Sequence, residues 1–400
     1  MRVSYRAEEM KVSPIRKLLP HAIEAKKKGI KVNHLNIGQP DTVVPNEFFE
    51  AISGYKSMEL GYESSNGNRE LIKSNLAYYK KNNILFEEDE IFITNGGSEA
   101  LNFAFFSTCN KGDNIIVFEP YYANYNNLAQ IMDIEFNAIT TNLENGFHLP
   151  PKSEIVEKIN SKTKAILISN PSNPTGCVYN RQELELLSEI ALEYDLWIIS
   201  DEVYREFIYG DIDYISFANI DKVKDRVMLI DSISKRYSAC GARIGSICSK
   251  NKQFNQQILK LCQSRLSVAT LEQIGAAKLY STDSDYINNV NIEYKKRRDI
   301  LLKKLSEIEG ISFNVPEGAF YVIVKLPVRD AEKFCIWLLQ DFNYNNETIM
   351  LCPAKDFYKS ENLGKDEVRI TYVQDKEILE RSIDILKKAL CIYVNKYQVK

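Results

Sequence analysis

Histidine is scarce in this 400-residue chain: His21, His34 and His148 are the only three, and none is near another obvious catalytic group in the sequence. A Ser-His-Asp triad and a histidine metal site are therefore disfavoured, and we expect no metal. The eight cysteines show no C-x-x-C spacing and most lie in apolar runs. This pattern favours reduced thiols in the cytoplasm over disulfides.

An excess of one charge sign is also missing. The 51 Lys and Arg residues nearly balance 54 Asp and Glu residues, for a net charge of −3. A nucleic-acid partner needs clustered basic residues, so we expect none. No uninterrupted apolar run approaches the length of a membrane span, and the N-terminus has no apolar core of a signal peptide. We therefore expect no membrane partner.

Two glycine fingerprints are absent, the G-x-G-x-x-G dinucleotide turn and the P-loop. A nicotinamide-dependent dehydrogenase is accordingly disfavoured. The chain instead has TNGGSEAL at positions 94–101, after a predicted strand and before a predicted helix. Gly97 and Ser98 would offer backbone N–H groups and a hydroxyl at a helix N-terminus, which can bind a phosphate. A simple Gly-Ser helix cap explains the same residues.

The middle of the chain alternates apolar, strand-like runs with helical periodicity. This alternation predicts an α/β fold with a mostly parallel sheet that helices cover on both faces. A smaller α+β domain should follow, so we expect a large domain over 46–284 and a small domain from 1–45 and 285–400. The predicted strands are Glu90–Thr94, Asn114–Phe118, Lys164–Ser169, Leu196–Asp201, Arg226–Asp231 and Ile244–Cys248.

The most informative stretch is SISKRYSACGARIG at 232–245, which follows a predicted strand. Lys235 lies there among small residues and could form a Schiff base if its pKa were lowered by burial or by a nearby cation such as Arg243. Asp201 ends another predicted strand and needs a cationic partner or hydrogen bonds to stay ionised. Asn173 lies in the turn NPSNPTG after a third strand, where open α/β sheets bind ligands.

Several other residues are weak signals when taken singly. Tyr122 could stack on a planar ring, and the guanidinium of Arg369 in VRITY could bind a carboxylate. Each also has an ordinary structural explanation, as a core tyrosine or a surface ion pair. The remaining candidates are Gly38 in LNIGQPD, Tyr62 in YESSNGNRE, Tyr204 in SDEVY and Ser232 in SISK. Taken together, the candidate residues supply an amine, a carboxylate, a phosphate-binding turn, a stacking ring and a guanidinium that can bind a carboxylate. This combination of groups suits pyridoxal phosphate and an amino acid.

In these motifs the chain strongly resembles the class I/II aminotransferases, the fold-type I pyridoxal-phosphate enzymes that include aspartate aminotransferase. The resemblance runs from about Leu35 to Tyr372 and rests most on NPSNPTG, SDEVY and SISK…ARIG in that order. It implies a seven-stranded sheet, a homodimer, and transfer of an amino group from an L-amino acid to a 2-oxo acid in a ping-pong reaction.

The resemblance also implies roles for individual residues. Lys235 would be the Schiff-base lysine and proton shuttle, and Asp201 would pair with the pyridine nitrogen. Tyr122 would stack on the cofactor ring. Asn173 and Tyr204 would form hydrogen bonds to the phenolic oxygen of that ring. Arg369, assisted by Asn173 and the backbone at Gly38, would take the α-carboxylate. The phosphate would be held by Gly97, Ser98, Ser232 and Arg243, with Tyr62 from the partner subunit.

The amino donor stays open. In some bacterial aspartate aminotransferases similar to this chain, a lysine binds the side-chain carboxylate of the substrate. This chain has Ser98 at that position, and Arg265 is a possible replacement for the lysine. An aromatic or hydrophobic substrate is an alternative, with the pocket candidates Tyr121, Tyr122, Tyr125 and Phe320. β-Elimination by a fold-type I lyase, such as a C–S lyase, would use the same lysine and aspartate. A sensor domain of a transcription regulator is a further alternative, although we expect no DNA-binding domain before this fold.

Overall fold

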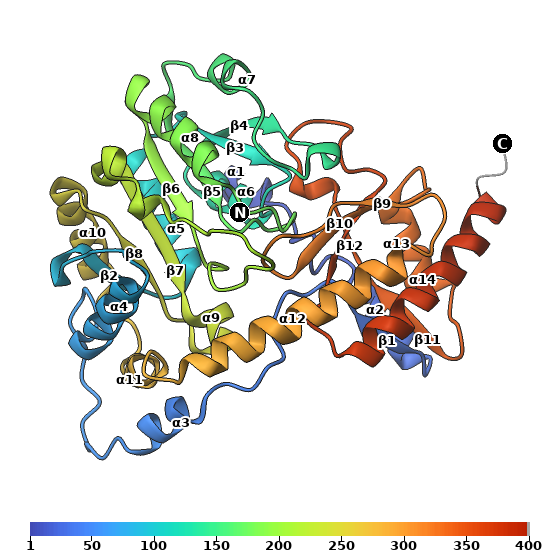
Figure 1. Cartoon of the computed structure of the whole chain (residues 1–400), viewed down its shortest axis with the longest axis horizontal. Helices are drawn as coiled ribbons and strands as arrows, with labels where there is room; N and C mark the ends of the chain where they lie inside the picture. Colours follow the sequence, from blue (N-terminus) through green and yellow to red (C-terminus); the bar gives the residue numbers. More distant parts are fainter. Residues whose placement is uncertain (398–400) are drawn as a thin grey trace.

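The computed structural model describes residues 1–397 and contains a large and a small unit (Figure 1). The large unit is built on a seven-stranded sheet in the order β2-β8-β7-β6-β5-β3-β4. Only β8 runs antiparallel to its neighbours, β2 and β7. The strands are β2 (Ile91–Thr94), β3 (Asn114–Glu119), β4 (Glu135–Thr140), β5 (Thr163–Ser169), β6 (Trp197–Asp201), β7 (Val227–Ser232) and β8 (Gly245–Cys248). The predicted α/β class and mostly parallel sheet are confirmed.

Sequence analysis missed β4, which lies at one edge of this sheet. Its residues EFNAIT are only partly buried, and a polar residue interrupts the apolar pattern. An edge strand is hydrogen-bonded on one side only and lacks the continuous apolar run of a central parallel strand. The other strands have such runs: β3 and β7 are buried along their whole length.

Helices cover both faces of the large sheet, as predicted. Ile115 and Val117 of β3 pack in one cluster with helices α5, α6 and α10. Ile116 and Phe118 of the same strand pack in another cluster with α7 and α8. This division follows from the alternation of side chains along a strand. The helices are α5 (Gly97–Thr108), α6 (Asn124–Ile131), α7 (Lys152–Glu157), α8 (Arg181–Glu193) and α10 (Lys252–Arg265).

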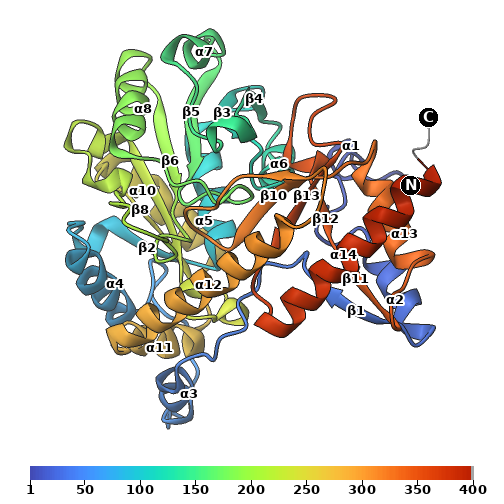
Figure 2. The ribbon, with the colours of Figure 1, turned by 45° about the vertical axis from the view of Figure 1, so that its right-hand side comes forward.

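Further helices of the large unit lie beyond the β2 edge and below the sheet (Figure 2). Helix α11 (Thr270–Leu279) packs on α3 (Asn46–Ser53) and on α4 (Arg69–Lys81). The one-turn helix α9 (Ile233–Arg236) directly follows β7. Across both units, the described residues also form six 3₁₀ turns: Glu88–Glu90, Leu143–Asn145, Phe217–Asn219, Asp221–Arg226, Cys240–Ala242 and Lys355–Phe357.

The small unit has an antiparallel sheet in the order β12-β13-β10-β9 and a parallel pair, β1 with β11. Helix α2 packs on α13, and α12 packs on α14, so residues 19–34 belong to this unit. Its strands are β1 (Lys31–His34), β9 (Ser312–Phe313), β10 (Tyr321–Lys325), β11 (Glu347–Met350), β12 (Cys352–Pro353) and β13 (Glu367–Thr371). Its helices are α2 (Leu19–Lys27), α12 (Ser284–Leu305), α13 (Ala331–Gln340) and α14 (Lys376–Tyr397).

Two segments connect the units. Helix α12 crosses from α11 to the small unit in Figure 1. At the N-terminus, helix α1 (Tyr5–Glu8) lies against α6 of the large unit, where Arg6 donates to the carbonyl of Ile131 at 3.0 Å. The division at 45/46 and 284/285 stays a prediction. Within residues 1–397, no helix has the length and apolar character to cross a bilayer.

Candidate active site

A cavity of about 680 Å³ lies at the carboxyl ends of β5, β6 and β7 and is closed by residues of the small unit. This is the edge where an open α/β sheet binds its ligand. Of the predicted site residues, the cavity is lined by Gly38, Gly97, Ser98, Tyr122, Asn173, Asp201, Tyr204, Ser232, Lys235, Arg243 and Arg369. Tyr62 does not line it and is 84% exposed on the connection between α3 and α4.

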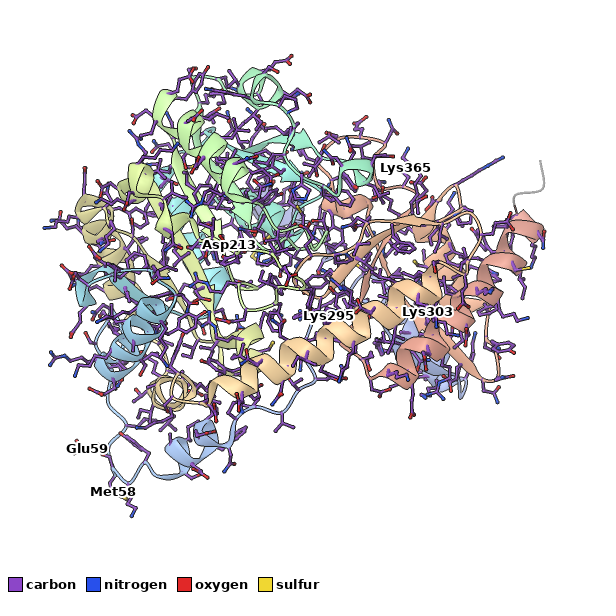
Figure 3. All side chains as sticks on the ribbon, in the orientation of Figure 1. Met58, Glu59, Asp213, Lys295, Lys303 and Lys365 are labelled. Atoms are coloured by element: carbon purple, nitrogen blue, oxygen red, sulfur yellow. The ribbon has the colours of Figure 1, made fainter. Side chains whose placement is uncertain are left out.

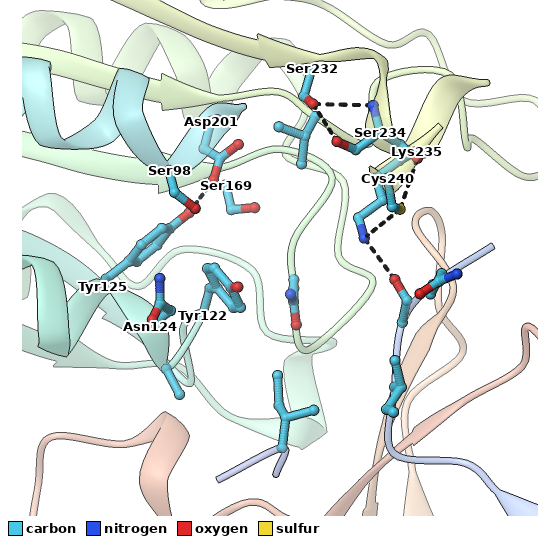
Figure 4. Close-up of a pocket in the computed structure, with 18 of the residues that line it drawn as sticks. Ser98, Tyr122, Asn124, Tyr125, Ser169, Asp201, Ser232, Ser234, Lys235 and Cys240 are labelled. Atoms are coloured by element: carbon cyan, nitrogen blue, oxygen red, sulfur yellow. Dashed lines mark hydrogen bonds between the residues drawn. The ribbon is translucent and has the colours of Figure 1, made fainter. Parts of the chain in front are cut away.

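Lys235 enters the cavity from α9, directly after β7 (Figure 4). Its Nζ donates to the carbonyl of Gly38 at 2.7 Å and lies 3.8 Å from Sγ of Cys240. Burial lowers the pKa of Lys235 below its usual value, and the charges of Arg369 and Arg243 lower it further. The amine is therefore easier to deprotonate than that of a surface lysine, as a nucleophile requires.

The position of Lys235 depends on a buried ion pair beneath it. Arg236, the next residue, donates from Nη2 to both carboxylate oxygens of Asp231 at 2.8 Å. Asp231 also accepts a hydrogen bond from Tyr79 at 3.1 Å. This network ties the end of β7 to the single turn of α9, which is too short to be stable alone.

Asp201 ends β6 and points into the same cavity. Its Oδ2 accepts a hydrogen bond from the Tyr125 hydroxyl at 2.6 Å, whereas Oδ1 is buried without a partner among the described residues. Burial raises the pKa of Asp201 to about 6. Hydrogen bonds from Tyr125 and the backbone of Val203 oppose this shift, because they favour the ionised form. The carboxylate therefore lacks one donor, and the protonated ring nitrogen of pyridoxal phosphate would supply it.

The start of α5 forms the anion-binding part of the cavity. Gly96 precedes this helix with φ of 75°, and a Cβ at this residue would lie 2.3 Å from Nη2 of Arg243. The guanidinium thus lies across a helix N-terminus that presents free N–H groups. Ser98 and Ser232 bring hydroxyls to the same cavity. This donor set fits a phosphate, so the site fits both ends of the cofactor.

Arg369 projects from β13 of the small unit and is only 1% exposed. It donates to Oδ1 of Asn173 at 2.9 Å and to the carbonyl of Asn36 at 2.7 Å. Its buried Nε has no partner among the described residues. A buried guanidinium with neutral partners and a face on a cavity is suited to a carboxylate ligand. Since Asn173 accepts with its oxygen, its amide N–H groups stay available as donors.

Tyr321 is a site residue that sequence analysis missed. Its hydroxyl lies 2.7 Å from that of Tyr204, and a Cβ at Gly38 would lie 1.9 Å from the Tyr321 oxygen. Glycine is therefore required at position 38. The prediction that Phe320 lines the pocket is wrong: this residue lies in the turn before β10, and its ring is fully buried in the small unit's core between those of Tyr204 and Phe207.

Two further candidates need correction. Arg265 does not line the cavity, because its Nη2 donates to the carbonyls of Ser65 and Ile93 at 3.1 and 3.2 Å. The predicted role of Arg265 as a second carboxylate site is therefore not supported. Tyr121 is also outside the cavity and donates to Asn126 at 2.7 Å, whereas Tyr122 and Tyr125 do line it.

Residues 30–386 match the family model of aminotransferase class I and II. The chain belongs to this family. This aminotransferase is 30% identical over 393 residues to a probable aspartate/prephenate aminotransferase of Aquifex aeolicus, with 96% of this chain and 98% of the relative covered. It is 29% identical to an aspartate aminotransferase of Bacillus subtilis over 400 residues, covering 97% and 98%.

Solved structures agree with this assignment. An alanine aminotransferase from Pyrococcus furiosus superposes on this aminotransferase with a TM-score of 0.90 at 31% identity, covering 98% and 100% of the two chains. An aspartate aminotransferase from Thermotoga maritima gives 0.88 at 29% identity, covering 97% and 100%. The predicted family, fold and pyridoxal-phosphate dependence are confirmed, and the enzyme transfers amino groups between amino acids and 2-oxo acids. All four relatives are named aminotransferases, which supports transfer over β-elimination.

Proposed function

We propose that the amino donor is a dicarboxylic amino acid, such as aspartate or glutamate, and that Arg16 binds its side-chain carboxylate. Arg16 lines the cavity from the segment between α1 and α2, and it is solvent-exposed. Among the described residues, no hydrogen bond or ion pair joins its guanidinium to another group. This unpaired cation at the cavity is the observation on which the proposal rests.

The balance of charge in the cavity supports a doubly anionic substrate. The charged residues that line it are Asp201 and four cations: Arg16, Lys235, Arg243 and Arg369. Lys235 is the amine of the reaction, Arg243 faces the phosphate site, and Arg369 is suited to the α-carboxylate. Arg16 is therefore left without an anion if the substrate has an apolar side chain. A second carboxylate gives it a charge-assisted partner.

The site residues divide the work of the reaction. Bound pyridoxal phosphate supplies an aldehyde that binds amines covalently and a ring that accepts electrons. Lys235 takes the proton from the substrate Cα as a neutral amine, which the lowered pKa favours. Asp201 holds the proton of the ring nitrogen, and Arg369, which reaches the cavity from the small unit, binds the α-carboxylate of the substrate. Since donor and acceptor use one site in turn, ping-pong kinetics are expected.

The proposal is tested by replacing Arg16. We expect Arg16→Gln to raise KM for aspartate and glutamate roughly ten-fold or more, since a hydrogen-bonded carboxylate loses its cation. KM for alanine, leucine and tyrosine should change little. Arg6→Gln, in the same N-terminal segment and bonded to Ile131 away from the cavity, is the matched control. The measurement is the half-reaction with each amino acid, followed by the cofactor spectrum.

Two results would contradict the proposal that the donor is a dicarboxylic amino acid. If wild-type enzyme reacts best with aromatic or hydrophobic amino acids, or if Arg16→Gln affects all substrates equally, the dicarboxylic assignment is wrong. In that case the aromatic side chains of Tyr122 and Tyr125 would define the substrate subsite.

We also propose that the enzyme is a homodimer in which Tyr62 completes the phosphate site of the partner. The connection between α3 and α4 exposes three large apolar side chains: Met58, Leu60 and Tyr62 are exposed by 100%, 63% and 84%. Figure 3 shows Met58 and Glu59 at the outer tip of this segment. Contiguous exposed apolar residues favour burial against another chain. A second copy of the chain would cover them.

Mixed dimers test this arrangement directly. Tyr62→Ala should weaken cofactor binding about ten-fold, the effect of losing one phosphate hydrogen bond. Coexpression of a Tyr62→Ala chain with a Lys235→Ala chain should then restore one intact site per mixed dimer. If Tyr62 served its own subunit's site, or if the protein were monomeric in sedimentation, no intact site would form and activity would not recover.

A cytoplasmic location is also proposed. All eight cysteines are free thiols in the described structure, and Cys391 is exposed. Free thiols persist in a reducing compartment.

A further inference from the structure

A group of polar side chains gathers outside the cavity, behind the turn that carries Asn173. The structure assigns a zinc site here, with His148, Cys177 and Glu317 as ligands and Glu183 as the residue that orients the histidine. None of these four residues lines the cofactor cavity, so the inference is independent of the proposed substrate. Sequence analysis predicted no metal site because up to 169 positions separate these residues.

The distances suit three ligands of one ion. One donor atom from each of His148, Cys177 and Glu317 lies within 4.8 Å of the others. Nε2 of His148 is 3.6 Å from Oε2 of Glu317, and Sγ of Cys177 is 3.7 Å from Nδ1 of the same ring. Ligand atoms about 2.0–2.3 Å from a tetrahedral zinc ion lie roughly 3.3–3.8 Å apart. The distance between Nε2 and Glu317 is already in this range, whereas Cys177 lies on the Nδ1 side of the ring, so its side chain must rotate toward Nε2 to bind the same ion.

Glu183 is held in place by the backbone and fixes the imidazole. Its Oε1 accepts from the N–H of Leu149 at 2.8 Å, and its Oε2 accepts from that of Asn180 at 2.9 Å. Both oxygens lie 3.1 Å from Nδ1 of His148. A carboxylate on one ring nitrogen keeps that nitrogen protonated and presents the other to a metal. Here the presented nitrogen is Nε2, which faces Glu317.

The chemistry of the group favours zinc over a hard cation. Two carboxylates and a thiol surround one imidazole, and zinc with an ionised thiol gives this group the same net charge as an imidazolium with a neutral thiol, so the donor atoms rather than the charge balance point to zinc. Zinc binding would release the Cys177 proton to solvent. Thiolate, imidazole and carboxylate together are typical zinc ligands, unlike the oxygen sets of magnesium or calcium. The side chains of His148 and Glu317 are 31% and 35% exposed, which gives the ion an entry path and leaves a fourth position for water.

A bound ion would join the two walls of the active site. Cys177 lies in the turn with Asn173, and Glu317 precedes the segment with Tyr321. The backbone already joins these parts, since the N–H groups of Glu317 and Gly318 donate to the carbonyl of Gly176 at 2.8 Å. Zinc would strengthen this connection, so its expected effect is on stability.

Metal titration of the holoenzyme tests the inference. After dialysis against a chelator, we expect the enzyme to bind one equivalent of added zinc per chain and to melt at a higher temperature. Added Co²⁺ should give visible d–d bands of a tetrahedral site with a thiolate ligand. Cys177→Ser and Glu317→Gln should each weaken zinc binding at least ten-fold, whereas Cys391→Ser, at the exposed cysteine, should not.

Two results would overturn the inference: less than about a tenth of an equivalent bound, or equal binding by wild type and the ligand variants. The first would leave His148 as a protonated bridge between Glu183 and Glu317. If Cys177→Ser fails to fold because position 177 is buried, Glu317→Gln at the partly exposed position decides the question.

Discussion

Lys235→Ala is expected to abolish multiple-turnover transamination, with a loss of at least about 10⁴-fold in kcat, because the general base and the covalent attachment disappear together. No other lysine lines the cavity among the described residues. Lys235→Arg should be equally inactive, since a guanidinium keeps the positive charge but does not lose its proton. The steady-state rate with the best donor and acceptor is the primary measurement.

Borohydride reduction followed by mass spectrometry gives a second readout. Wild-type enzyme should gain the mass of the reduced cofactor on Lys235, and both variants should gain none. Lys250→Ala is a suitable control, because Lys250 pairs with Glu90 at 2.7 Å and does not line the cavity. Turnover by Lys235→Ala within ten-fold of wild type would show that another group is the base.

Asp201→Asn is expected to lower kcat/KM by roughly 10²- to 10³-fold. Asparagine preserves the shape and still accepts the Tyr125 hydrogen bond, but it cannot hold a proton on the ring nitrogen by charge. Because the pKa of Asp201 is about 6 in the cofactor-free site, cofactor affinity of the wild type should fall as the pH drops through 6. The cofactor affinity of the Asp201→Asn variant should lack this pH dependence. Fluorescence titration with the cofactor at pH 5 and pH 8 measures the difference.

The same substitution should stabilise the cofactor-free protein. The pKa of Asp201 rises from 3.8 to about 6 on folding. The protonated carboxyl therefore contributes favourably to the free energy of unfolding below pH 4, and this contribution is lost as the pH rises through 6. Above that pH the wild type retains a buried charge, and Asp201→Asn should be more stable by up to about 3 kcal/mol. At about pH 3, below both pKa values, the difference should vanish. A variant that melts below wild type at pH 8 would contradict this account.

Much of the cavity lining was predictable because the proposed site residues end or follow strands. Asp201 ends β6, and Asn173 and Lys235 come after β5 and β7; the continuous apolar runs of these strands were recognised. The carboxyl ends of parallel strands meet at one sheet edge, so their neighbours in space follow from their positions in sequence. Gly97 and Arg243 meet for a different reason: β2 and β8 pair antiparallel, which places the residues after β2 beside those before β8.

The errors concern side chains whose partners are remote. Arg265 and Arg16 are both arginines, but the carbonyls of Ser65 and Ile93 hold the first away from the cavity, whereas the second lines the cavity with no partner for its guanidinium among the described residues. Phe320 and Tyr321 are adjacent aromatic residues, and only their packing decides that the second reaches Tyr204. No local pattern distinguishes the members of either pair.

The sequence by itself determined the α/β fold and the family, and it singled out Lys235 and Asp201 as the proposed amine and carboxylate. Those properties depend on apolar periodicity and on strand–turn–helix order, which are local. Only the tertiary structure decided which cations stay unpaired, which aromatic rings face the cavity, and that His148, Cys177 and Glu317 converge. These outcomes depend on burial and on contacts between residues more than a hundred positions apart, which the order of residues does not display.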